Sequence, residues 1–553
     1  MSEEKSEAYY YPLLIKDILE YAVFAWPNQE IVYRDIKRFS YSEFYERVKR
    51  VAGALKSLGI GFGDRVGVVD WDTYRYLELY FAVPSIGAVL HKINLRLAPE
   101  IILYTINHAE DKILIIKDEF VPIFEKVRDK LPKDIKFILA SDAAKFPLEE
   151  TKLQPAYDYE ELINKSSPYE FPTFDENTVA TTFYTTGTTG LPKGVLFTHR
   201  QLVLHTLAAA VTFAFPSEAM FKVTDVSLNL VPYFHAHSWG IPYIAILLGL
   251  KTLLPGRYDW DLILEMARKE GKPEIFSACV PTILWALVNH PKAEEYRDTF
   301  SKWKFVIGGD TLPKGLAEKA RALGARVNAG YGLSESCPVL TIAFYKPYML
   351  EWSEDKKLDV RIRTGHPAPL VKLKVCDEHG NEVPKDWKST GEIVVRAPWL
   401  TQEYYKDPEK TKELWRGGWM HTGDIAIWNE EGYIHIVGRS KFLIKSGGEW
   451  ISPVLIEEIL STHPAVLECA VVPAPHSKWG ERPVALVVLR PEYSGKVSEE
   501  EFKQYLNKAV QEGKLTKWSV PDRVLFVNSI PKTSVGKIDR LTLTQQYKEF
   551  KLG

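Results

Sequence analysis

Cysteine is scarce in this chain, and long hydrophobic runs are missing from it. Four cysteines occur among 553 residues, far apart and without a CxxC pair, which argues against a disulfide framework or a cysteine metal site and fits a reducing cytoplasm. The longest apolar stretch, residues 240–250, is shorter than the roughly 20 residues of a membrane span and predicts a buried helix. The charged first residues contain no apolar segment, so we expect neither a signal peptide nor an integral membrane segment.

An excess of charge of either sign is also lacking. The formal net charge is −2, with 26% charged and 46% hydrophobic residues, which is typical of a soluble globular protein. Nucleic acid binding through phosphates needs a clustered basic face, so no nucleic acid partner is expected. The length exceeds what a single hydrophobic core supports, and two or more domains are therefore expected.

Strand-like and helix-like segments alternate from the N-terminus to about residue 330. Residues 41–55 have the apolar spacing of a helix, and residues 65–70 follow as a short apolar strand. From about residue 371, short strands separated by turns indicate a small antiparallel unit. We predict an α/β fold with a large N-terminal domain of several subdomains, residues 1–440, with mostly parallel sheets. Residues 441–553 are predicted to form a small α+β domain.

A segment rich in glycine and threonine is the most informative part of the sequence. Residues 184–194 read Tyr-Thr-Thr-Gly-Thr-Thr-Gly-Leu-Pro-Lys-Gly, and an apolar strand pattern follows, with Thr198 as a predicted helix N-cap. Glycine lets backbone N–H groups approach phosphate oxygens, threonine hydroxyls add donors, and Lys193 supplies a cation. Pro192 precedes that lysine, so the loop is not a Walker A motif. A flexible polar turn is the alternative, although the density of glycine and threonine argues against it.

This segment resembles the signature of the acyl-adenylate-forming superfamily, which contains acyl-CoA synthetases, adenylation domains of peptide synthetases and beetle luciferases. Other motifs of that superfamily occur in the right order over nearly the whole chain. The resemblance implies an enzyme that uses ATP, Mg²⁺ and coenzyme A and joins a carboxylic acid first to AMP and then to the thiol of CoA. It also implies a mobile C-terminal domain with Lys441 at the hinge, where Phe442 replaces a common aspartate.

The resemblance gives the reaction chemistry to a few residues. Thr185 and Glu335 would bind Mg²⁺, a cation that prefers oxygen ligands. Lys537, at the end of Pro-Lys-Thr-Ser-Val-Gly-Lys, is similar to the catalytic lysine that stabilises charge developing at the α-phosphate. The residues implied at the nucleotide and at CoA are Thr186, Gly187, Thr188, Thr189, Lys193, Gly308, Gly309, Asp310, Gly330, Tyr331, Gly332, Ser334, Asp424, Arg439, Lys445, Gly447, Gly448 and Trp450.

Three of these nucleotide residues have specific implied roles. The ring of Tyr331 would stack on adenine, and the Asp424 carboxylate would accept hydrogen bonds from the ribose hydroxyls. Arg439 would bind ribose or phosphate. Ser334 stands where the superfamily usually has threonine and keeps the hydroxyl group.

The segment Pro-Tyr-Phe-His-Ala-His-Ser-Trp, residues 232–239, allows two interpretations. Two histidines here and two upstream suggest a metal site, but no downstream ligand cluster completes it. The resemblance instead places His235 beside the substrate carboxylate as a catalytic residue. It places His237, Ser238 and Trp239 at the acyl pocket.

Within the superfamily, medium- and long-chain fatty acyl-CoA synthetases are the most similar, through Lys-Ser-Gly-Gly-Glu-Trp-Ile-Ser at residues 445–452. Short-acid relatives usually carry tryptophan where this chain has Gly332, so its absence is interpreted as room for a longer acid. The polar side chains of His237 and Ser238 leave a short or hydroxylated acid open. No anchor for a substrate ammonium is evident near His235, which disfavours an amino acid.

Two hypotheses of another class remain: a non-catalytic binding protein descended from this fold, and a luciferase-like oxygenase. The joint presence of Lys537, Glu335, Asp424 and Arg439 argues against the first. The segment up to Asn28 resembles that of dimeric fatty acyl-CoA synthetases, which favours a homodimer.

Overall fold

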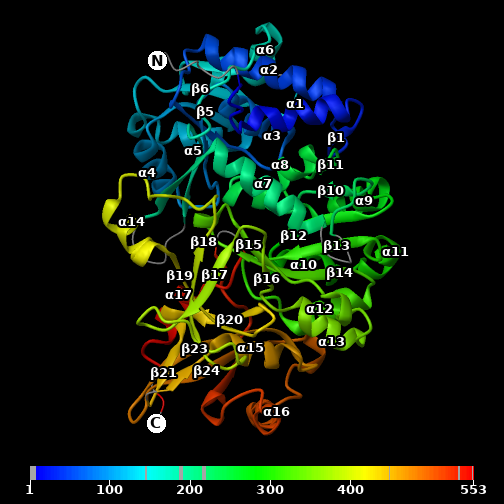
Figure 1. Ribbon diagram of the computed structural model, residues 1–553, viewed down its shortest axis with the longest axis vertical. Helices are drawn as coiled ribbons and strands as arrows, with labels where there is room; N and C mark the ends of the chain where they lie inside the picture. Colours follow the sequence, from blue (N-terminus) through cyan, green and yellow to red (C-terminus); the bar gives the residue numbers. More distant parts are fainter. Residues whose placement is uncertain are drawn as a thin grey trace, which may run out of the picture.

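Two large sheets make up most of the N-terminal part of the molecule (Figure 1). The structure, a computed structural model, describes residues 8–143, 146–185, 191–214, 220–447, 449–533, 536–550 and 552. One sheet has seven strands in the order β7-β6-β5-β3-β4-β8-β9, parallel except for the β8–β9 pair. Its strands are β3 (Arg65–Val69), β4 (Val89–Lys92), β5 (Asp111–Lys117), β6 (Lys136–Ala140), β7 (Ala156–Asp158), β8 (Val179–Thr185) and β9 (Lys193–Thr198).

The second sheet has nine strands in the order β16-β15-β14-β13-β12-β10-β11-β1-β2. It is parallel from β14 to β1 and antiparallel at both ends, which confirms the predicted α/β fold with mostly parallel sheets. Its strands are β1 (Glu30–Tyr33), β2 (Lys37–Ser40), β10 (Val226–Leu228), β11 (Lys251–Leu254), β12 (Ile275–Cys279), β13 (Trp303–Ile307), β14 (Arg326–Gly332), β15 (Val339–Ile342) and β16 (His366–Pro367).

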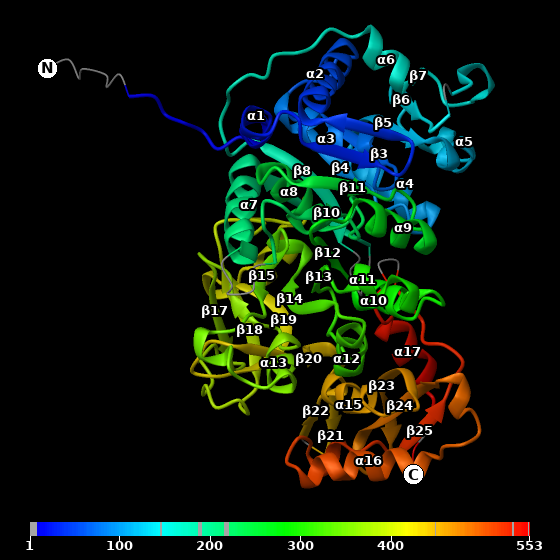
Figure 2. The same ribbon diagram turned by 90° about the vertical axis from the view of Figure 1, so that its right-hand side faces the viewer.

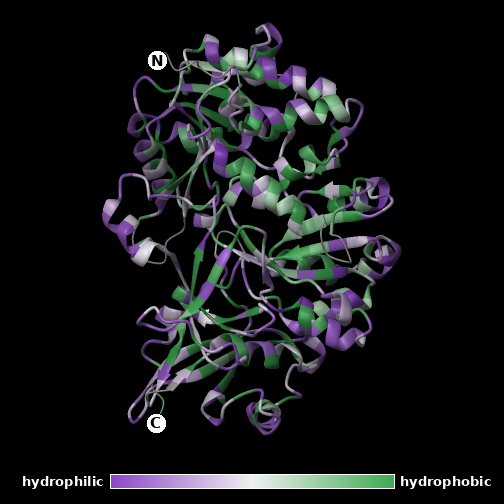
Figure 3. Cartoon of the chain, in the orientation of Figure 1, coloured by the Kyte–Doolittle hydropathy of each residue, from purple (hydrophilic) through white to green (hydrophobic). Residues whose placement is uncertain are grey.

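Helices cover these sheets, and the apolar strands lie inside (Figure 3). They are α1 (Ile15–Ala25), α2 (Tyr41–Ser57), α3 (Tyr74–Ser85), α4 (Pro99–Ala109), α5 (Val121–Glu125), α6 (Tyr159–Lys165), α7 (His199–Ala214), α8 (Ile241–Leu247), α9 (Trp260–Glu270), α10 (Pro281–Val288), α11 (Arg297–Phe300), α12 (Lys314–Ala322) and α13 (Glu354–Arg361).

Local sequence signals explain where several helices begin. Helix α2 starts behind a capping box of Ser40 and Glu43, as its apolar spacing predicts. The Thr198 hydroxyl accepts a hydrogen bond from the Gln201 N–H at 3.3 Å, which confirms the predicted N-cap of α7. Helix α8 is almost entirely buried, so the apolar stretch is the core helix that the sequence predicts. Among the described residues, none of the helices has both the length and the apolar character needed to cross a lipid bilayer.

The predicted antiparallel unit is a four-stranded sheet in the order β17-β18-β19-β20. Its strands are β17 (Lys372–Cys376), β18 (Gly391–Arg396), β19 (Met420–Trp428) and β20 (Ile434–Arg439), with α14 (Pro408–Leu414) between β18 and β19. Strand β19 was not among the predicted strands, because polar residues interrupt its apolar pattern.

The C-terminal segment builds a sheet of its own at the lower end of the molecule (Figure 2). Its hydrophobic clusters contain described residues from Ile444 onward, whereas the large N-terminal cluster ends at Ile434. The proposed domain boundary at residues 440 and 441 lies between these clusters. The elements are β21 (Ile444–Ser446), β22 (Glu449–Ile451), α15 (Pro453–Ser461), β23 (Val466–His476), β24 (Gly480–Leu489), α16 (Glu499–Gln511), β25 (Arg523–Phe526) and α17 (Arg540–Tyr547).

Candidate active site

A cavity of about 390 Å³ lies where the C-terminal segment meets the body of the molecule. It opens at the carboxyl ends of strands β8, β13 and β14, the edge at which open α/β sheets bind ligands. Thr533 and residues 537–541 close it from the C-terminal side. The predicted residues that line it are Thr185, Lys193, His235, Gly309, Asp310, Gly330, Tyr331, Gly332, Ser334, Glu335, Asp424, Arg439 and Lys537.

An ion pair and a phenol hold the predicted ribose ligand Asp424 in place. Asp424 and Arg439 are register partners on β19 and β20, and Arg439 Nε lies 2.9 Å from Asp424 Oδ1. The Tyr331 hydroxyl donates to Asp424 Oδ2 at 2.7 Å. Asp424 raises the pKa of Arg439, and burial raises the pKa of Tyr331. Both partners therefore keep their protons, and the carboxylate is fixed as an acceptor for hydroxyl groups.

Oxygen and nitrogen groups suited to phosphates line another wall of the cavity. Thr185 ends β8 and is the register partner of Lys193 at the start of β9. Glu335 lies in the turn after β14 and accepts a hydrogen bond from the Tyr404 phenol at 2.7 Å. A carboxylate and a hydroxyl are the donor types that Mg²⁺ prefers, so Glu335 and Thr185 fit that ion. Thr186, Gly187, Thr188 and Thr189, which the sequence places at the phosphates, lie outside the described residues, as does Gly448.

A metal cage made by protein side chains alone is not found. Within the described ranges, no three His, Cys, Asp or Glu side chains gather as a metal site. The histidines upstream of the His-X-His pair serve the fold instead. His199 Nδ1 accepts the Ile15 N–H at 3.1 Å, and His205 Nε2 accepts the Val339 N–H at 3.2 Å.

Lys537 enters the cavity from the C-terminal segment. Its Cε lies 3.2 Å from the position that a Cβ on Gly309 would occupy, so the side chain passes directly over the turn after β13. Burial lowers its pKa, and the nearby Arg439 lowers it further. Asp310, Asp424 and Glu335 oppose this effect and favour the ammonium form. The geometry brings a cation to the edge where the nucleotide ligands converge.

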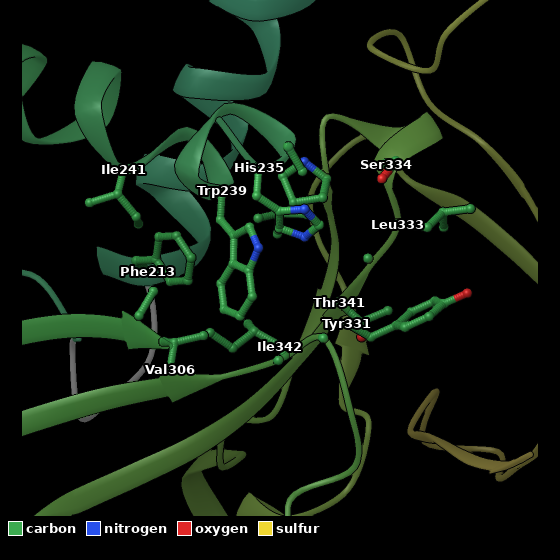
Figure 4. A pocket seen from close by; sticks show the side chains of 18 of the residues that line it. Phe213, His235, Trp239, Ile241, Val306, Tyr331, Leu333, Ser334, Thr341 and Ile342 are labelled. Carbon is green, nitrogen blue, oxygen red and sulfur yellow. The ribbon is translucent and has the colours of Figure 1, made fainter. Parts of the chain in front are cut away.

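A smaller cavity of about 50 Å³ shares the lining residues Lys537 and His235 with the larger one. Figure 4 shows side chains that line this smaller cavity. Its apolar walls come from several elements, and the indole of Trp239 stands among them, against Gly308. Burial lowers the pKa of His235 to about 3, so this histidine is neutral at the mouth. Other described side chains of the wall are Phe213, Ile241, Val306, Val339 and Ile342.

A left-handed turn decides which side chains reach this cavity. Ala236, His237, Ser238 and Trp239 all have positive φ, between 41° and 58°. Such backbone costs about 1–2 kcal/mol for each residue that is not glycine, so surrounding contacts must hold it. His237 Nε2 lies 2.7 Å from Thr181 Oγ1, and the Ser238 hydroxyl donates to the Val231 carbonyl at 2.6 Å.

The prediction that His237 and Ser238 line the acyl pocket is therefore wrong. Both side chains are fully buried in the core, whereas His235, Ala236 and Trp239 of the same segment line the cavity. Successive side chains on a tight turn point in different directions, which a resemblance of linear motifs does not reveal.

The interpretation of Gly332 as vacant space for an acyl chain is also corrected. Strands β14 and β15 meet here in a bulge, and a Cβ on Gly332 would overlap the carbonyl oxygen of Pro338. Glycine is thus required by the close approach of two backbone segments. Gly332 still lines both cavities, but its missing side chain does not lengthen the smaller one.

Two protein-family models match the sequence of this chain. The model of the AMP-binding enzyme family matches residues 19–405, and the model of the AMP-binding enzyme C-terminal domain matches residues 455–537. The chain belongs to the AMP-binding enzyme family. It is an AMP-forming acid–CoA ligase, and this family uses ATP, Mg²⁺ and CoA.

Curated relatives of the ligase cover nearly its whole length. The long-chain-fatty-acid–CoA ligase of Thermus thermophilus is 41% identical over 541 residues, which are 97% of this chain and 95% of the relative. The 3-methylmercaptopropionyl-CoA ligase of Ruegeria lacuscaerulensis is 36% identical, with 97% and 98% covered.

Solved structures share the fold. ATP-bound MatB from Rhodopseudomonas palustris superimposes with a TM-score of 0.81 at 25% identity, over 98% of this chain and 100% of that one. The anthranilate CoA ligase AuaEII in complex with anthranoyl-AMP has a TM-score of 0.84 at 24% identity, over 97% and 98%. The second likeness concerns the fold alone.

Of the residues implied at CoA, the described ones, Lys445, Gly447 and Trp450, do not line either cavity. Lys445 and Trp450 lie exposed on the β21–β22 hairpin, with the ammonium 5.4 Å from the indole ring. The Gly447 N–H donates to the Trp479 carbonyl at 2.9 Å. Lys441, the predicted hinge residue, lies on the connection between β20 and β21, where partial burial and the nearby Arg439 lower its pKa to about 8. In this arrangement the ligase presents Lys537, not the hairpin, to the nucleotide cavity.

Sequence reasoning missed two residues of the site. Tyr404 contacts Glu335 from the connection between β18 and α14, and Phe213 closes the apolar cavity from α7. The paired tyrosines at 404 and 405 are a visible signal in the sequence of the ligase. No spacing rule connects them to a carboxylate about 70 residues away.

Proposed function

We propose that this ligase activates an uncharged aliphatic monocarboxylic acid, with a medium- or long-chain fatty acid as the preferred substrate. The observation that carries the proposal is the apolar cavity that begins at Lys537 and His235 and contains no described charged side chain deeper in. Such walls suit a hydrocarbon chain and leave a second carboxylate or an ammonium group without a partner. The fatty-acid names of relatives at 41% and 33% identity support this choice.

In the proposed first half-reaction, a carboxylate oxygen of the acid attacks the α-phosphorus of ATP, and pyrophosphate leaves with the electrons of the broken P–O bond. Tyr331 stacks on adenine, and Asp424 holds the ribose. The ammonium of Lys537 stabilises negative charge that grows on the α-phosphate oxygens in the transition state. Glu335 and Thr185 would hold Mg²⁺ together with ATP, and the bound ion would compensate the negative charge of the phosphates.

His235 is proposed to orient the acid rather than to remove a proton. An acid of this class is already ionised near neutral pH, since its pKa resembles that of a glutamate side chain. A neutral imidazole can donate one N–H bond to a carboxylate without adding a charge. The lowered pKa of His235 fits that role.

The second half-reaction is proposed to follow a rotation of the C-terminal domain about Lys441. The CoA thiol, as thiolate, attacks the acyl carbon, and AMP leaves. Lys537 is withdrawn in that pose, and the β21–β22 hairpin with Lys445, Gly447, Gly448 and Trp450 faces the site. The exposure of Lys445 and Trp450 in the present pose is consistent with a surface kept for a later partner.

A second candidate substrate is a short acid, and the size of the cavity favours it. About 50 Å³ accommodates on the order of four water-sized groups, because one such group needs about 10–15 Å³. Relatives include a 3-methylmercaptopropionyl-CoA ligase and a 4-hydroxybutyrate–CoA ligase. A longer acid requires the indole of Trp239 to move.

Acyl-CoA formation with a series of unbranched acids from two to sixteen carbons tests both candidates. AMP release in the presence of CoA is the measurement, with 4-hydroxybutyrate and 3-methylmercaptopropionate as polar members of the series. A maximum kcat/KM at eight or more carbons supports the fatty-acid proposal. A maximum at three to five carbons contradicts it and favours the short-acid alternative.

We also propose a cytoplasmic homodimer. Residues 8–12 extend away from the body of the molecule (Figure 2) and include the exposed Tyr9, Tyr10 and Tyr11. Phe24 on the adjacent helix α1 is 87% exposed, which is unusual for so apolar a side chain. Sedimentation of the wild type and of Phe24→Asp tests the dimer, and a monomeric wild type at micromolar concentration would contradict it.

A further inference from the structure

Tyr404 contacts two predicted phosphate-site groups at once. Its hydroxyl donates to Glu335 Oε1 at 2.7 Å, and the ammonium of Lys193 lies 4.6 Å from the centre of its ring. The three side chains line the larger cavity together. Tyr404 itself is 7% exposed, and burial raises the pKa of its phenol, so the hydroxyl remains a donor at any physiological pH.

The backbone around Tyr404 is tied to the same two segments. The Thr401 N–H donates to the Glu335 carbonyl at 2.8 Å, and the Tyr405 N–H donates to the Gly194 carbonyl at 2.8 Å. Thr411 Oγ1 accepts the N–H of Tyr404 itself at 2.9 Å. The tyrosine is thus held at a set distance from both the turn that carries Glu335 and the strand that begins at Lys193.

The two contacts leave both charges available to a ligand. Among the described residues, the Tyr404 hydroxyl is the side-chain donor to the Glu335 carboxylate. This hydrogen bond engages one of the two carboxylate oxygens, Oε1 of Glu335. Lys193 has no described carboxylate within ion-pair distance and rests on an aromatic face instead. A cation–π contact orients an ammonium without neutralising it, whereas a salt bridge would compete with phosphate for the charge.

We propose that Tyr404 is a positioning residue for the MgATP site. Its hydroxyl orients the Glu335 carboxylate for Mg²⁺, and its ring seats the Lys193 ammonium toward the ATP phosphates. The inference rests on the adenylation chemistry proposed above for Glu335 and extends it to a residue outside the motifs of the nucleotide site.

Two substitutions separate the two contacts. Tyr404→Phe keeps the ring under Lys193 and removes the hydroxyl from Glu335, while Tyr404→Leu removes both. A hydrogen bond to a charged group contributes enough that its loss corresponds to about tenfold or more in an equilibrium constant. We therefore expect Tyr404→Phe to raise the Mg²⁺ concentration for half-maximal acyl-AMP formation about tenfold, and Tyr404→Leu in addition to weaken ATP binding when Mg²⁺ is saturating.

The half-reactions provide a readout that a merely structural role would not give. Thioester formation from supplied acyl-AMP and CoA needs neither Mg²⁺ nor the β- and γ-phosphates, so Tyr404→Phe should leave it within about twofold of the wild type. Tyr433→Phe is the matched control, because it also removes a phenol that donates one hydrogen bond, at 2.8 Å to the Phe344 carbonyl, but outside both cavities. Its Mg²⁺ dependence should equal that of the wild type.

A double-mutant cycle with Glu335→Gln decides whether Tyr404 acts through Glu335. In the Glu335→Gln background, Tyr404→Phe should change the Mg²⁺ dependence little, since the carboxylate it orients is gone. Equal Mg²⁺ dependence of wild type and Tyr404→Phe, or equal losses in both half-reactions, would overturn the proposal. Calorimetric titration of each enzyme variant with ATP, at a series of fixed Mg²⁺ concentrations and without any acid, gives the same comparison. This measurement holds even if the proposed acid is wrong.

Discussion

His435 and Glu458 form an ion pair between the N-terminal part of the chain and the C-terminal segment: Nε2 of His435 on β20 lies 3.1 Å from Oε1 of Glu458 on α15. Two further contacts accompany it. The Ser452 hydroxyl donates to the Val437 carbonyl, and helix α12 approaches α15 so closely that a Cβ on Gly315 would overlap the Ser461 carbonyl. The pair therefore belongs to the domain pose that brings Lys537 to the nucleotide cavity.

This pair predicts that the domain pose depends on pH. Burial lowers the pKa of His435, but the attraction of Glu458 outweighs it and the pKa is raised above 6.5, with Arg363 opposing the increase. A raised histidine pKa means that the pair stabilises this pose below that pKa and that the contribution is lost as pH rises through it. We expect the fraction in this pose to fall as pH rises above about 6.5, by about two- to fivefold in the equilibrium constant.

Energy transfer between dyes on the two domains measures that fraction. Glu458→Gln removes the charge that raises the His435 pKa and should flatten the pH profile. A profile that is identical in the wild type and in Glu458→Gln would assign the pH dependence to other groups.

Lys537→Ala should separate the two half-reactions. The C-terminal segment places the Lys537 side chain against Gly309. Loss of a preorganised group that stabilises transition-state charge lowers the rate by about 10²–10³-fold. Acyl-AMP formation should slow by that factor, while thioester formation from supplied acyl-AMP persists. Single-turnover assays measure each step, with the exposed Lys548→Ala as control. Equal loss in both steps would argue against two domain poses.

Gly332→Ala is expected to impair all acids alike. A Cβ at this position overlaps the Pro338 carbonyl, so the β14–β15 bulge must shift whatever acid is bound. Gly61→Ala is the matched control, because it also adds a Cβ, which would lie 3.6 Å from the Asp64 carboxylate and outside both cavities. We expect kcat/KM to fall about tenfold or more across the acid series for Gly332→Ala, in line with strain of about 1–3 kcal/mol. A selective gain for acetate would restore the interpretation of Gly332 as vacant pocket space.

Trp239→Ala should favour longer acids. The indole occupies the apolar cavity beside Gly308, and its removal frees a volume equal to several methylene groups. Each additional methylene buried in an apolar pocket changes kcat/KM by about 10–200-fold, so the preferred length should increase by several carbons. Competition assays with acid mixtures measure the change, and Trp285→Ala on the surface of α10 is the control. An unchanged preferred length would place the end of the acyl pocket elsewhere.

The sequence determined much of this protein by itself. Strand–helix alternation predicted the parallel sheets, and Thr198 marked where helix α7 begins. These features are local, because capping and apolar periodicity depend on neighbours along the chain. The ordered motifs around Tyr331, Asp424 and Lys537 likewise predicted residues that the fold brings to one cavity.

The tertiary structure alone decided which side of a turn or strand each residue faces. The left-handed turn sends His237 and Ser238 into the core and Trp239 into the cavity, although all three are adjacent in sequence. The structural role of Gly332 depends on the Pro338 carbonyl, which lies across a bulge. The role of Tyr404 depends on its contact with Glu335, 69 residues away in the sequence. Such contacts follow from the packing of segments that are distant along the chain, and local periodicity carries no information about them.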